Sequence, residues 1–191
     1  GSLAVTGRTP AHVDSVARAA RERASAVSAV PFTELSRLLV SADLVINASS
    51  CGQAGLRTAD DGRLFTLEPY SPLAAAAPGP VSRPGSDADT LLACTARSAS
   101  AVERNHRESL GYLLATPAPV RVFDIVYAPL ETVLLRQARL TGHASLNGKF
   151  MNIQQAVTAM FDVVLRRYFE SRGQFTGAMR RSIVDVMTDV W

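Results

Sequence analysis

Hydrophobic positions along the chain follow two alternating patterns, short apolar runs and longer stretches with helical spacing. The runs at residues 3–7, "LAVTG", and at Leu44–Asn47 are typical of buried strands. A helical pattern follows the first run at residues 8–25, and another precedes the second run at residues 32–42. Helices that alternate with buried strands predict βαβ units, and therefore an α/β fold with a parallel sheet.

This alternation stops at residue 54 and returns only near residue 120. The stretch between these positions is rich in Ala, Pro, Gly and Ser, as in "EPYSPLAAAAPGPVSRPGSDAD". Such a composition predicts a long irregular insertion that is partly disordered. The segment "DTLLACTARSASAVERNHRESLGYLLA" within it is compatible with one helix or with two. We therefore divide the chain into the first part of an α/β domain (1–53), the insertion (54–119) and the remainder of that domain with C-terminal helices (120–191).

After the insertion, residues Val120–Tyr127 predict a further buried strand. Asp124 interrupts its apolar run, and Pro129 is expected to stop the strand because proline cannot donate a ladder hydrogen bond. We expect a helix over Thr132–Thr141, capped by the hydroxyl of its first residue. An acidic residue inside a buried strand, and an aromatic hydroxyl at its carboxyl end, both need a chemical reason.

Helical spacing dominates the last part of the chain. After a short segment at residues 143–148, apolar residues recur with helical spacing from Lys149 to about Ser171, which predicts the longest helix of the protein. A final amphipathic helix is expected over Thr176–Val190. The sequence shows no internal repeat.

Charge and composition exclude several classes of function. The chain has 20 Lys and Arg against 17 Asp and Glu, and the cations are dispersed, without a basic stripe interleaved with aromatics. We therefore expect no nucleic-acid partner. No apolar run approaches the roughly 20 residues of a bilayer-spanning helix, and the N-terminus lacks a signal-peptide pattern, so we expect a soluble, cytoplasmic protein. Cys51 and Cys94 lack zinc-ligand spacing, which indicates reduced thiols and no metal site.

Distinctive residues follow three of the predicted strands, at 7–9, 47–52 and 124–127. In an open parallel sheet, ligands bind beyond the carboxyl ends of the strands. An Arg after the second strand of a dinucleotide fold pairs with the 2′-phosphate of NADP, and a helix start favours anions. Arg8, followed by Thr9 at a helix start, therefore fits an NADP site, although an Arg at a strand end is more often a solvated surface residue.

Four motifs, taken together and in order, resemble the nucleotide-binding half of shikimate dehydrogenases. They are "GRTP", "DLVINASSCG", "VFDIVYAPLETVLLRQA" and "NGKFMNIQQA", and the resemblance covers roughly residues 3–52 and 120–162. It implies a Rossmann-like fold, NADP as cofactor, and reversible NADPH-dependent reduction of 3-dehydroshikimate to shikimate in aromatic amino acid biosynthesis. The long insertion is compatible with a multifunctional shikimate-pathway polypeptide.

The resemblance also implies a set of site residues. Those expected at the cofactor are Gly7, Arg8, Thr9, His12, Asn47, Ala48, Ser49, Ile125 and Gly148; those expected at shikimate or 3-dehydroshikimate are Tyr127 and Gln155. The chain departs from the family at Gly7, where Asn is usual, and at His12, which replaces a second basic residue. Gln53 replaces a Met beside the nicotinamide. Asp124 is expected to secure neighbouring backbone donors below the cleft.

Parts of the family's machinery have no counterpart in this sequence. The only Lys is Lys149, which matches no catalytic position, and the first strand with its Gly-rich phosphate loop would precede Leu3. The family's Lys–Asp pair belongs to an N-terminal substrate domain, so we expect no catalytic residue here, an inactive isolated chain, and that domain as a partner. Quinate specificity is a substrate variant of this hypothesis. The alternative is a non-catalytic regulatory or assembly module descended from the family.

Overall fold

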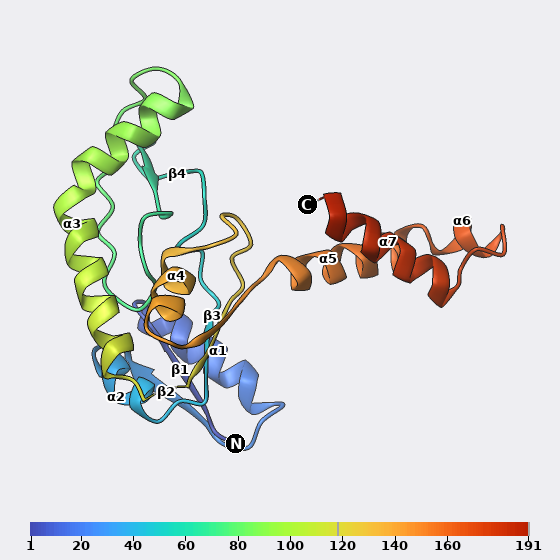
Figure 1. Ribbon diagram of the computed structural model, residues 1–191, viewed down its shortest axis with the longest axis horizontal. Coiled ribbons are helices and arrows are strands. Elements are labelled where there is room, and N and C mark those ends of the chain that lie inside the picture. Colours follow the sequence, from blue (N-terminus) through green and yellow to red (C-terminus); the bar gives the residue numbers. More distant parts are fainter. Residues whose placement is uncertain (118, 191) are drawn as a thin grey trace.

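The computed structural model describes residues 1–117 and 119–190 of the chain. Ala118 and Trp191, which belong to the predicted insertion and the predicted C-terminal part, lie outside the described residues. In chain order the elements are β1 (Leu3–Gly7), α1 (Pro10–Arg21), β2 (Val27–Pro31), η1 (Phe32–Glu34), α2 (Leu35–Val40), β3 (Leu44–Asn47), β4 (Leu56–Thr58), β5 (Leu64–Thr66), α3 (Asp87–Ala115), β6 (Arg121–Asp124), α4 (Val133–Leu140), β7 (Ala144–Asn147), α5 (Lys149–Val157), η2 (Thr158–Val164), α6 (Arg166–Glu170) and α7 (Gly177–Val190). Figure 1 shows a body from which α5, η2, α6 and α7 project as an arm.

The predicted parallel α/β architecture is confirmed. β1 pairs in parallel with β2, and β6 pairs in parallel with β3 on one side and β7 on the other. β4 and β5 form a separate antiparallel hairpin within the insertion. The short, largely exposed strands β2 and β7 were not predicted, because Ala and Ser occupy much of them and no buried apolar run marks either one.

The main core covers one face of the sheet β3–β6–β7. Its members come from α2, α3, α4, the segment around Leu73 and β6, and they are Leu35, Leu39, Leu73, Leu113, Val120, Val122, Leu134, Leu135 and Ala138. Residues paired across parallel strands point to the same face, so Asp124, two positions after Val122, also points into this side. The opposite face leaves Ile46 and Leu146 exposed at 51% and 62%.

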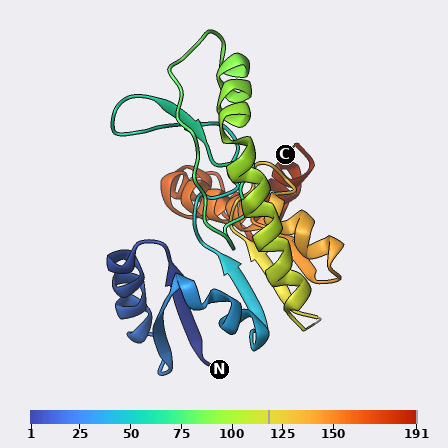
Figure 2. The same cartoon turned by 90° about the vertical axis from the view of Figure 1, so that its left-hand side faces the viewer.

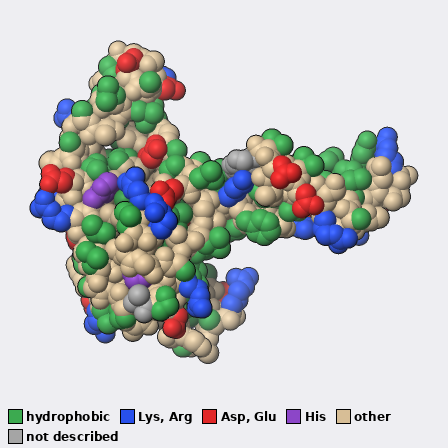
Figure 3. All heavy atoms as spheres, in the orientation of Figure 1, with side chains coloured by type: hydrophobic (Ala, Val, Ile, Leu, Met, Phe, Trp, Pro, Cys, Tyr) green, Lys and Arg blue, Asp and Glu red, His purple; other side chains and the backbone are tan. Residues whose placement is uncertain are grey.

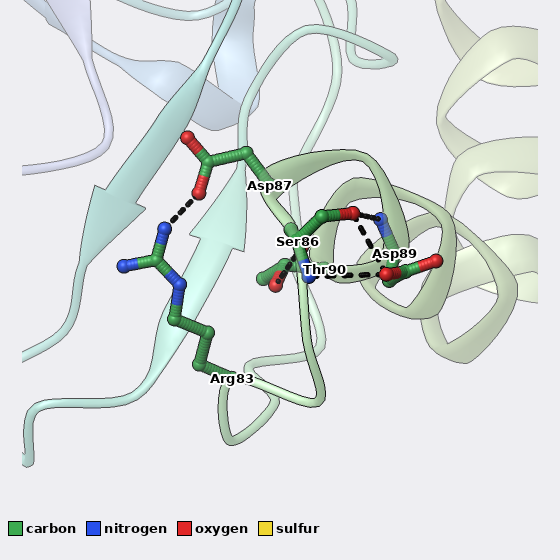
Figure 4. A network of polar contacts seen from close by, with 5 residues as sticks. All are labelled: Arg83, Ser86, Asp87, Asp89 and Thr90. Atoms are coloured by element: carbon green, nitrogen blue, oxygen red, sulfur yellow. Dashed lines mark hydrogen bonds and ion pairs between the residues drawn. The ribbon is translucent and has the colours of Figure 1, made fainter.

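The insertion contains one continuous helix, α3, which settles the choice between one helix and two. Figure 2 shows α3 running along the body. At its N-terminus the Ser86 hydroxyl accepts a hydrogen bond from the Asp89 amide at 3.2 Å, and the Asp89 carboxylate accepts one from the Ser86 amide at 3.0 Å (Figure 4). Arg83 forms an ion pair with Asp87 beside this capping box.

Replacing the capping hydroxyl should therefore weaken the helix. We expect Ser86→Ala to lower the free energy of unfolding by about 1 kcal/mol, the usual effect of losing an N-cap. Denaturant unfolding measures it. Ser100→Ala, at an exposed interior position of the same helix, is the matched control and should be neutral or slightly stabilising because Ala has the higher helix propensity. Equal effects of the two substitutions would contradict the capping role.

A buried amide joins α3 to the Ala- and Pro-rich segment before it. Asn105, which is 1% exposed, accepts a hydrogen bond from the Ser71 amide at 2.8 Å and donates to the carbonyls of Ser71, Ala74 and Ala75 at 3.0–3.1 Å. An irregular backbone needs such partners when it is buried. Asn105 therefore supplies hydrogen bonds to the backbone of residues 71–75, which form no helix or strand, and so stabilises this buried segment.

The expectation of one long helix from Lys149 to about Ser171 is wrong. The helix changes to a π-helix at η2, where the Leu165 amide donates to the Met160 carbonyl at 2.7 Å, and α6 follows as a separate turn. The Phe161 ring lies 4.8 Å from the Phe169 ring and 5.0 Å from the Phe175 ring. These contacts come from residues beyond the break, so the local helical spacing could not predict it.

Hydrophobic side chains are exposed along the arm, as Figure 3 shows. They include Met160, Val163, Val164 and Tyr168. No helix in the described ranges, however, is both long enough and apolar enough to cross a bilayer.

Candidate functional site

Three polar residues form a row at the carboxyl ends of the sheet strands. Asn47, Asp124 and Asn147 are the last residues of β3, β6 and β7, and they are direct partners in the parallel register. Carboxyl ends of parallel strands are the usual place for a ligand site. The segments that follow these residues carry five of the eleven predicted site residues, which are Ala48, Ser49, Ile125, Tyr127 and Gly148.

The loop after β3 is organised by the side chain of Asn47. Its Oδ1 accepts hydrogen bonds from the Ser49 amide at 3.0 Å and the Ser49 hydroxyl at 2.7 Å. Its Nδ2 donates to the Cys51 carbonyl at 3.1 Å and to the Asp124 carboxylate at 2.9 Å. Asn47 is 6% exposed. The structure therefore gives this predicted cofactor residue a loop-ordering role, and the exposed Ala48 and Ser49 form the surface of that loop.

Asp124 is fully buried at the end of β6. One oxygen of its carboxylate accepts hydrogen bonds from Asn47 and from the Val126 amide at 3.0 Å, and the other accepts one from the Thr132 hydroxyl at 2.7 Å. Burial raises its pKa, and these hydrogen bonds oppose that rise. The sequence-based expectation that Asp124 secures a neighbouring backbone donor is confirmed.

The predicted end of this strand is wrong by three residues. β6 ends at Asp124, well before Pro129. The Val126 amide is bonded to the Asp124 side chain, and the Asn147 side chain donates to the Val126 carbonyl at 3.0 Å. Both backbone groups are thereby removed from the ladder, so side chains end the strand. The following helix is as predicted, since Thr132 caps α4 through the Leu135 amide at 3.3 Å.

The backbone comes unusually close to Ile125 at Gly148, the residue that follows β7. A Cβ at Gly148 would lie 2.2 Å from the Ile125 carbonyl oxygen. The Asn147 side chain accepts a hydrogen bond from the Lys149 amide at 2.7 Å and donates to the Leu130 carbonyl at 2.9 Å, which fixes this junction. Two predicted cofactor positions, Ile125 and Gly148, are therefore in direct backbone contact.

The turn between β1 and α1 carries the predicted phosphate residues. Arg8, Thr9 and His12 are all exposed. Thr9 occupies the N-cap position of α1, yet its side chain makes no capping hydrogen bond, and the first turn contains no acidic residue. Such a helix start favours an anion. Gly7 lies against Val13, with 3.2 Å between a built Cβ and the Val13 Cγ2, so a larger side chain would press on α1.

Tyr127 and Gln155, the two predicted substrate residues, come from two different parts of the structure. Tyr127 is half-buried in the segment after β6, and Gln155 is exposed on α5. The amine of Lys149 donates to the Thr188 carbonyl at 3.2 Å and so joins the start of α5 to α7.

Two features that organise the site were not predicted, the contact of Thr132 with Asp124 and the role of Asn147. A Thr eight positions after an acid has no recognisable motif, and the row Asn47–Asp124–Asn147 depends on a register that sequence does not reveal. In the part of the chain that the structure describes, no group of three or more His, Cys, Asp or Glu side chains could bind a metal ion.

Cys51 lies beneath the loop after β3. Cys51 and Cys94 are free and are each 1% exposed. Burial raises the pKa of the Cys51 thiol from its ordinary value of 9.0 to about 11, while the nearby charge of Arg8 opposes the shift.

Both thiols should therefore react slowly with iodoacetamide at pH 8 in the native protein and rapidly after denaturation, as mass spectrometry would show. Because the folded protein retains the Cys51 proton more tightly, this group's contribution to stability is complete below a pH of 9.0 and is lost as the pH rises toward about 11. Rapid labelling of Cys51 in the folded state would contradict its burial.

The chain is similar in sequence to shikimate dehydrogenases over part of its length. It is 43% identical over 68 residues to the shikimate dehydrogenase (NADP(+)) of Methylobacterium radiotolerans and 38% identical over 68 residues to that of Bartonella tribocorum. Each match covers 36% of this chain and 22% of the relative, so the matched part spans about a fifth of these curated relatives. No protein-family model matches the chain. The resemblance predicted from the motifs is confirmed over this stretch.

Two solved structures align with the chain. One is the shikimate 5-dehydrogenase of Listeria monocytogenes in complex with shikimate and NAD, with 18% identity, a TM-score of 0.47, and coverage of 83% of this chain and 40% of that one. The other is the quinate dehydrogenase of Corynebacterium glutamicum in complex with NAD, with 22% identity, a TM-score of 0.48, and coverage of 96% and 46%.

Proposed function

We propose, from the similarity to shikimate dehydrogenases, that this chain is the cofactor-binding part of an NADP-dependent shikimate dehydrogenase. The observation that carries the proposal is the 43% identity over 68 residues to the Methylobacterium radiotolerans shikimate dehydrogenase (NADP(+)). The reaction is the reversible reduction of 3-dehydroshikimate to shikimate, in which NADPH supplies a hydride to the ring carbonyl carbon and a proton is added to its oxygen.

The cofactor contacts follow from the residues beyond the strand ends. Arg8 and Thr9 bind the 2′-phosphate by charge-assisted hydrogen bonds at the open start of α1, with His12 beside them. The Asn47–Ser49 loop, Ile125 and Gly148 line the approach of the nicotinamide. The close contact between Ile125 and Gly148 supports this assignment. At this end of the sheet the two backbones lie directly against each other, with no room for a Cβ at Gly148.

Tyr127 and Gln155 contact the substrate in this proposal. A phenol hydroxyl and a carboxamide suit the several hydroxyl groups of shikimate, since each can donate and accept. These residues bind and orient the ring. Proton transfer to the carbonyl oxygen belongs to the Lys–Asp pair of the substrate domain, which is the proposed partner of this chain.

The pairing of the strands supports a further strand in the complete sheet. Among the described residues, β1 pairs only with β2, and β3 pairs only with β6. In the doubly wound order 3-2-1-4-5-6, a central strand lies between the two halves and carries the Gly-rich phosphate loop. We propose that a parallel strand between β1 and β3 completes the sheet in this way.

The proposal is tested by the absorbance of NADPH, with the longest natural chain that contains this segment. Shikimate with NADP should give NADPH, and NAD and quinate serve as controls for the cofactor and the substrate. Reduction of NADP by shikimate would establish the activity. A folded chain that contains the Lys–Asp pair and produces no NADPH would overturn the proposal and favour the non-catalytic module.

A further inference from the structure

The carboxylate of Asp124 connects three segments of the site. Its hydrogen-bond donors are the Asn47 amide group at the end of β3, the Val126 backbone amide after β6, and the Thr132 hydroxyl at the start of α4. Asp124 itself is 0% exposed. A buried carboxylate without such partners would strongly destabilise the fold, so this arrangement requires all three donors to stay in place.

Each partner of Asp124 in turn fixes a loop. Asn47 orders residues 47–51 through Ser49 and the Cys51 carbonyl. Thr132 lies against Gly52, where a built Cβ would be 3.5 Å from the Thr132 Cβ. The loop after β3 and the segment after β6 also meet directly, through the Ala54 amide and the Ala128 carbonyl at 2.8 Å. Asp124 thus lies at the junction of these two segments.

We propose that Asp124 is a positioning residue that locks the loop 47–52 against the segment 125–132. The lock orients the cofactor-side loop and the substrate-side Tyr127 toward the same cleft, although Asp124 touches neither ligand. This inference rests on the proposed function for its effect on the reaction, whereas the coupling of the two segments rests on the hydrogen bonds alone.

The directions of the hydrogen bonds explain why a carboxylate is needed. The Asn47 Oδ1 already accepts from Ser49, so its Nδ2 must donate to Asp124. The Thr132 hydroxyl accepts from the Leu135 amide, and its proton is directed to Asp124. The third partner, a backbone amide, can only donate. All three groups present hydrogens, and only an ionised carboxylate offers acceptors on both oxygens.

The test is Asp124→Asn in the longest natural chain, with Asn105→Asp as the matched control. Asn at this position keeps the shape but places N–H groups opposite a donor. We expect kcat for NADP reduction by shikimate to fall roughly 100-fold, since misplacement on the order of 1 Å has this effect. Asn105 is an equally buried side chain whose hydrogen bonds go to residues 71–75 and not to either of the two segments. Its exchange should therefore lower the melting temperature and leave kcat unchanged.

Hydrogen exchange of the 191-residue chain separates this inference from the proposed function. Asp124→Asn should remove protection from the amides of residues 47–52 and 125–132 while α3 keeps its protection. This result supports the lock even if the parent chain reduces no NADP with shikimate. Wild-type protection in both segments, or wild-type kcat in an active parent, would overturn it.

A second pair of variants decides the matter if Asp124→Asn does not fold. Thr132→Val keeps nearly the same shape and removes both the donor to Asp124 and the acceptor that caps α4, whereas Thr132→Ser retains both. We expect a lower kcat and faster exchange at residues 47–52 for the Val variant, with the Ser variant close to wild type. Equal behaviour of the two variants would overturn the inference.

Discussion

Gly148→Ala should lower the free energy of unfolding by about 3 kcal/mol, the upper end of the usual range for overpacking. The added Cβ would lie 2.2 Å from the Ile125 carbonyl oxygen and 2.5 Å from its carbon. These are backbone atoms at the end of the central strand β6, so no side chain can rotate away. The backbone of Gly148 has φ −72° and ψ −2°, which Ala adopts freely, so the whole effect is steric.

Gly111→Ala is the matched control for this prediction. Gly111 lies in the interior of α3, and a Cβ there meets nothing within 4 Å. The same chemical change should therefore raise stability by about 0.5–1 kcal/mol, because Gly is a poor helix former. Denaturant unfolding measures both variants. Gly148→Ala would cost no more free energy of unfolding than an ordinary surface substitution only if the ends of β6 and β7 separate easily. Such a small loss would contradict the prediction.

The loss should extend to the proposed cofactor site. A shift that relieves the clash must move α5 and its Gln155 away from the segment after β6, which carries Tyr127. We therefore expect NADP affinity and shikimate affinity to fall together in Gly148→Ala, whereas Gly111→Ala retains both.

The fold was predictable where its signals are local. The strands β1 and β3 and the Thr132 cap of α4 depend on residues that are neighbours in the sequence, and all three are confirmed. The expectation that the two strands are buried is wrong, because Leu3, Leu44 and Ile46 are exposed at 43%, 52% and 51%. β7 was missed because it is an exposed edge strand of small and polar residues. The break in the long C-terminal helix was missed because Phe161 packs on residues beyond it.

The candidate site was predictable to a similar degree. Parallel strands bring their carboxyl ends to one edge, so residues 47–52 and 124–127 were expected at the same edge of the sheet. The register of β3 and β6 places Asn47 beside Asp124. Which side chain contacts which could not be predicted, because the contact of Thr132 with Asp124 depends on how α4 returns over the sheet. The sequence predicted a strand to Tyr127 that Pro129 stops, whereas the side chains of Asp124 and Asn147 end β6 at Asp124.

Arg8→Ala should weaken NADP binding by roughly 10- to 150-fold, which corresponds to the about 1.5–3 kcal/mol of a hydrogen bond to a charged group. The guanidinium is exposed at the start of α1, where no acidic side chain of the first turn competes with a phosphate. NAD lacks the 2′-phosphate, so its affinity should not change. Calorimetric titration of the longest natural chain with each cofactor measures the difference.

Arg18→Ala is the matched control, because Arg18 is an exposed cation in the last turn of the same helix. Arg18→Ala removes the same charge, but at the end of α1 that is remote from the predicted phosphate site. A general electrostatic effect would therefore weaken NADP binding in both variants alike. A specific contact predicts a loss for Arg8→Ala alone, one that diminishes at high salt as the contact is screened. If Arg8→Ala lowered NAD affinity as much as NADP affinity, or left NADP affinity unchanged, Arg8 would not bind the 2′-phosphate. The proposed phosphate site at the start of α1 would then lack its main cation.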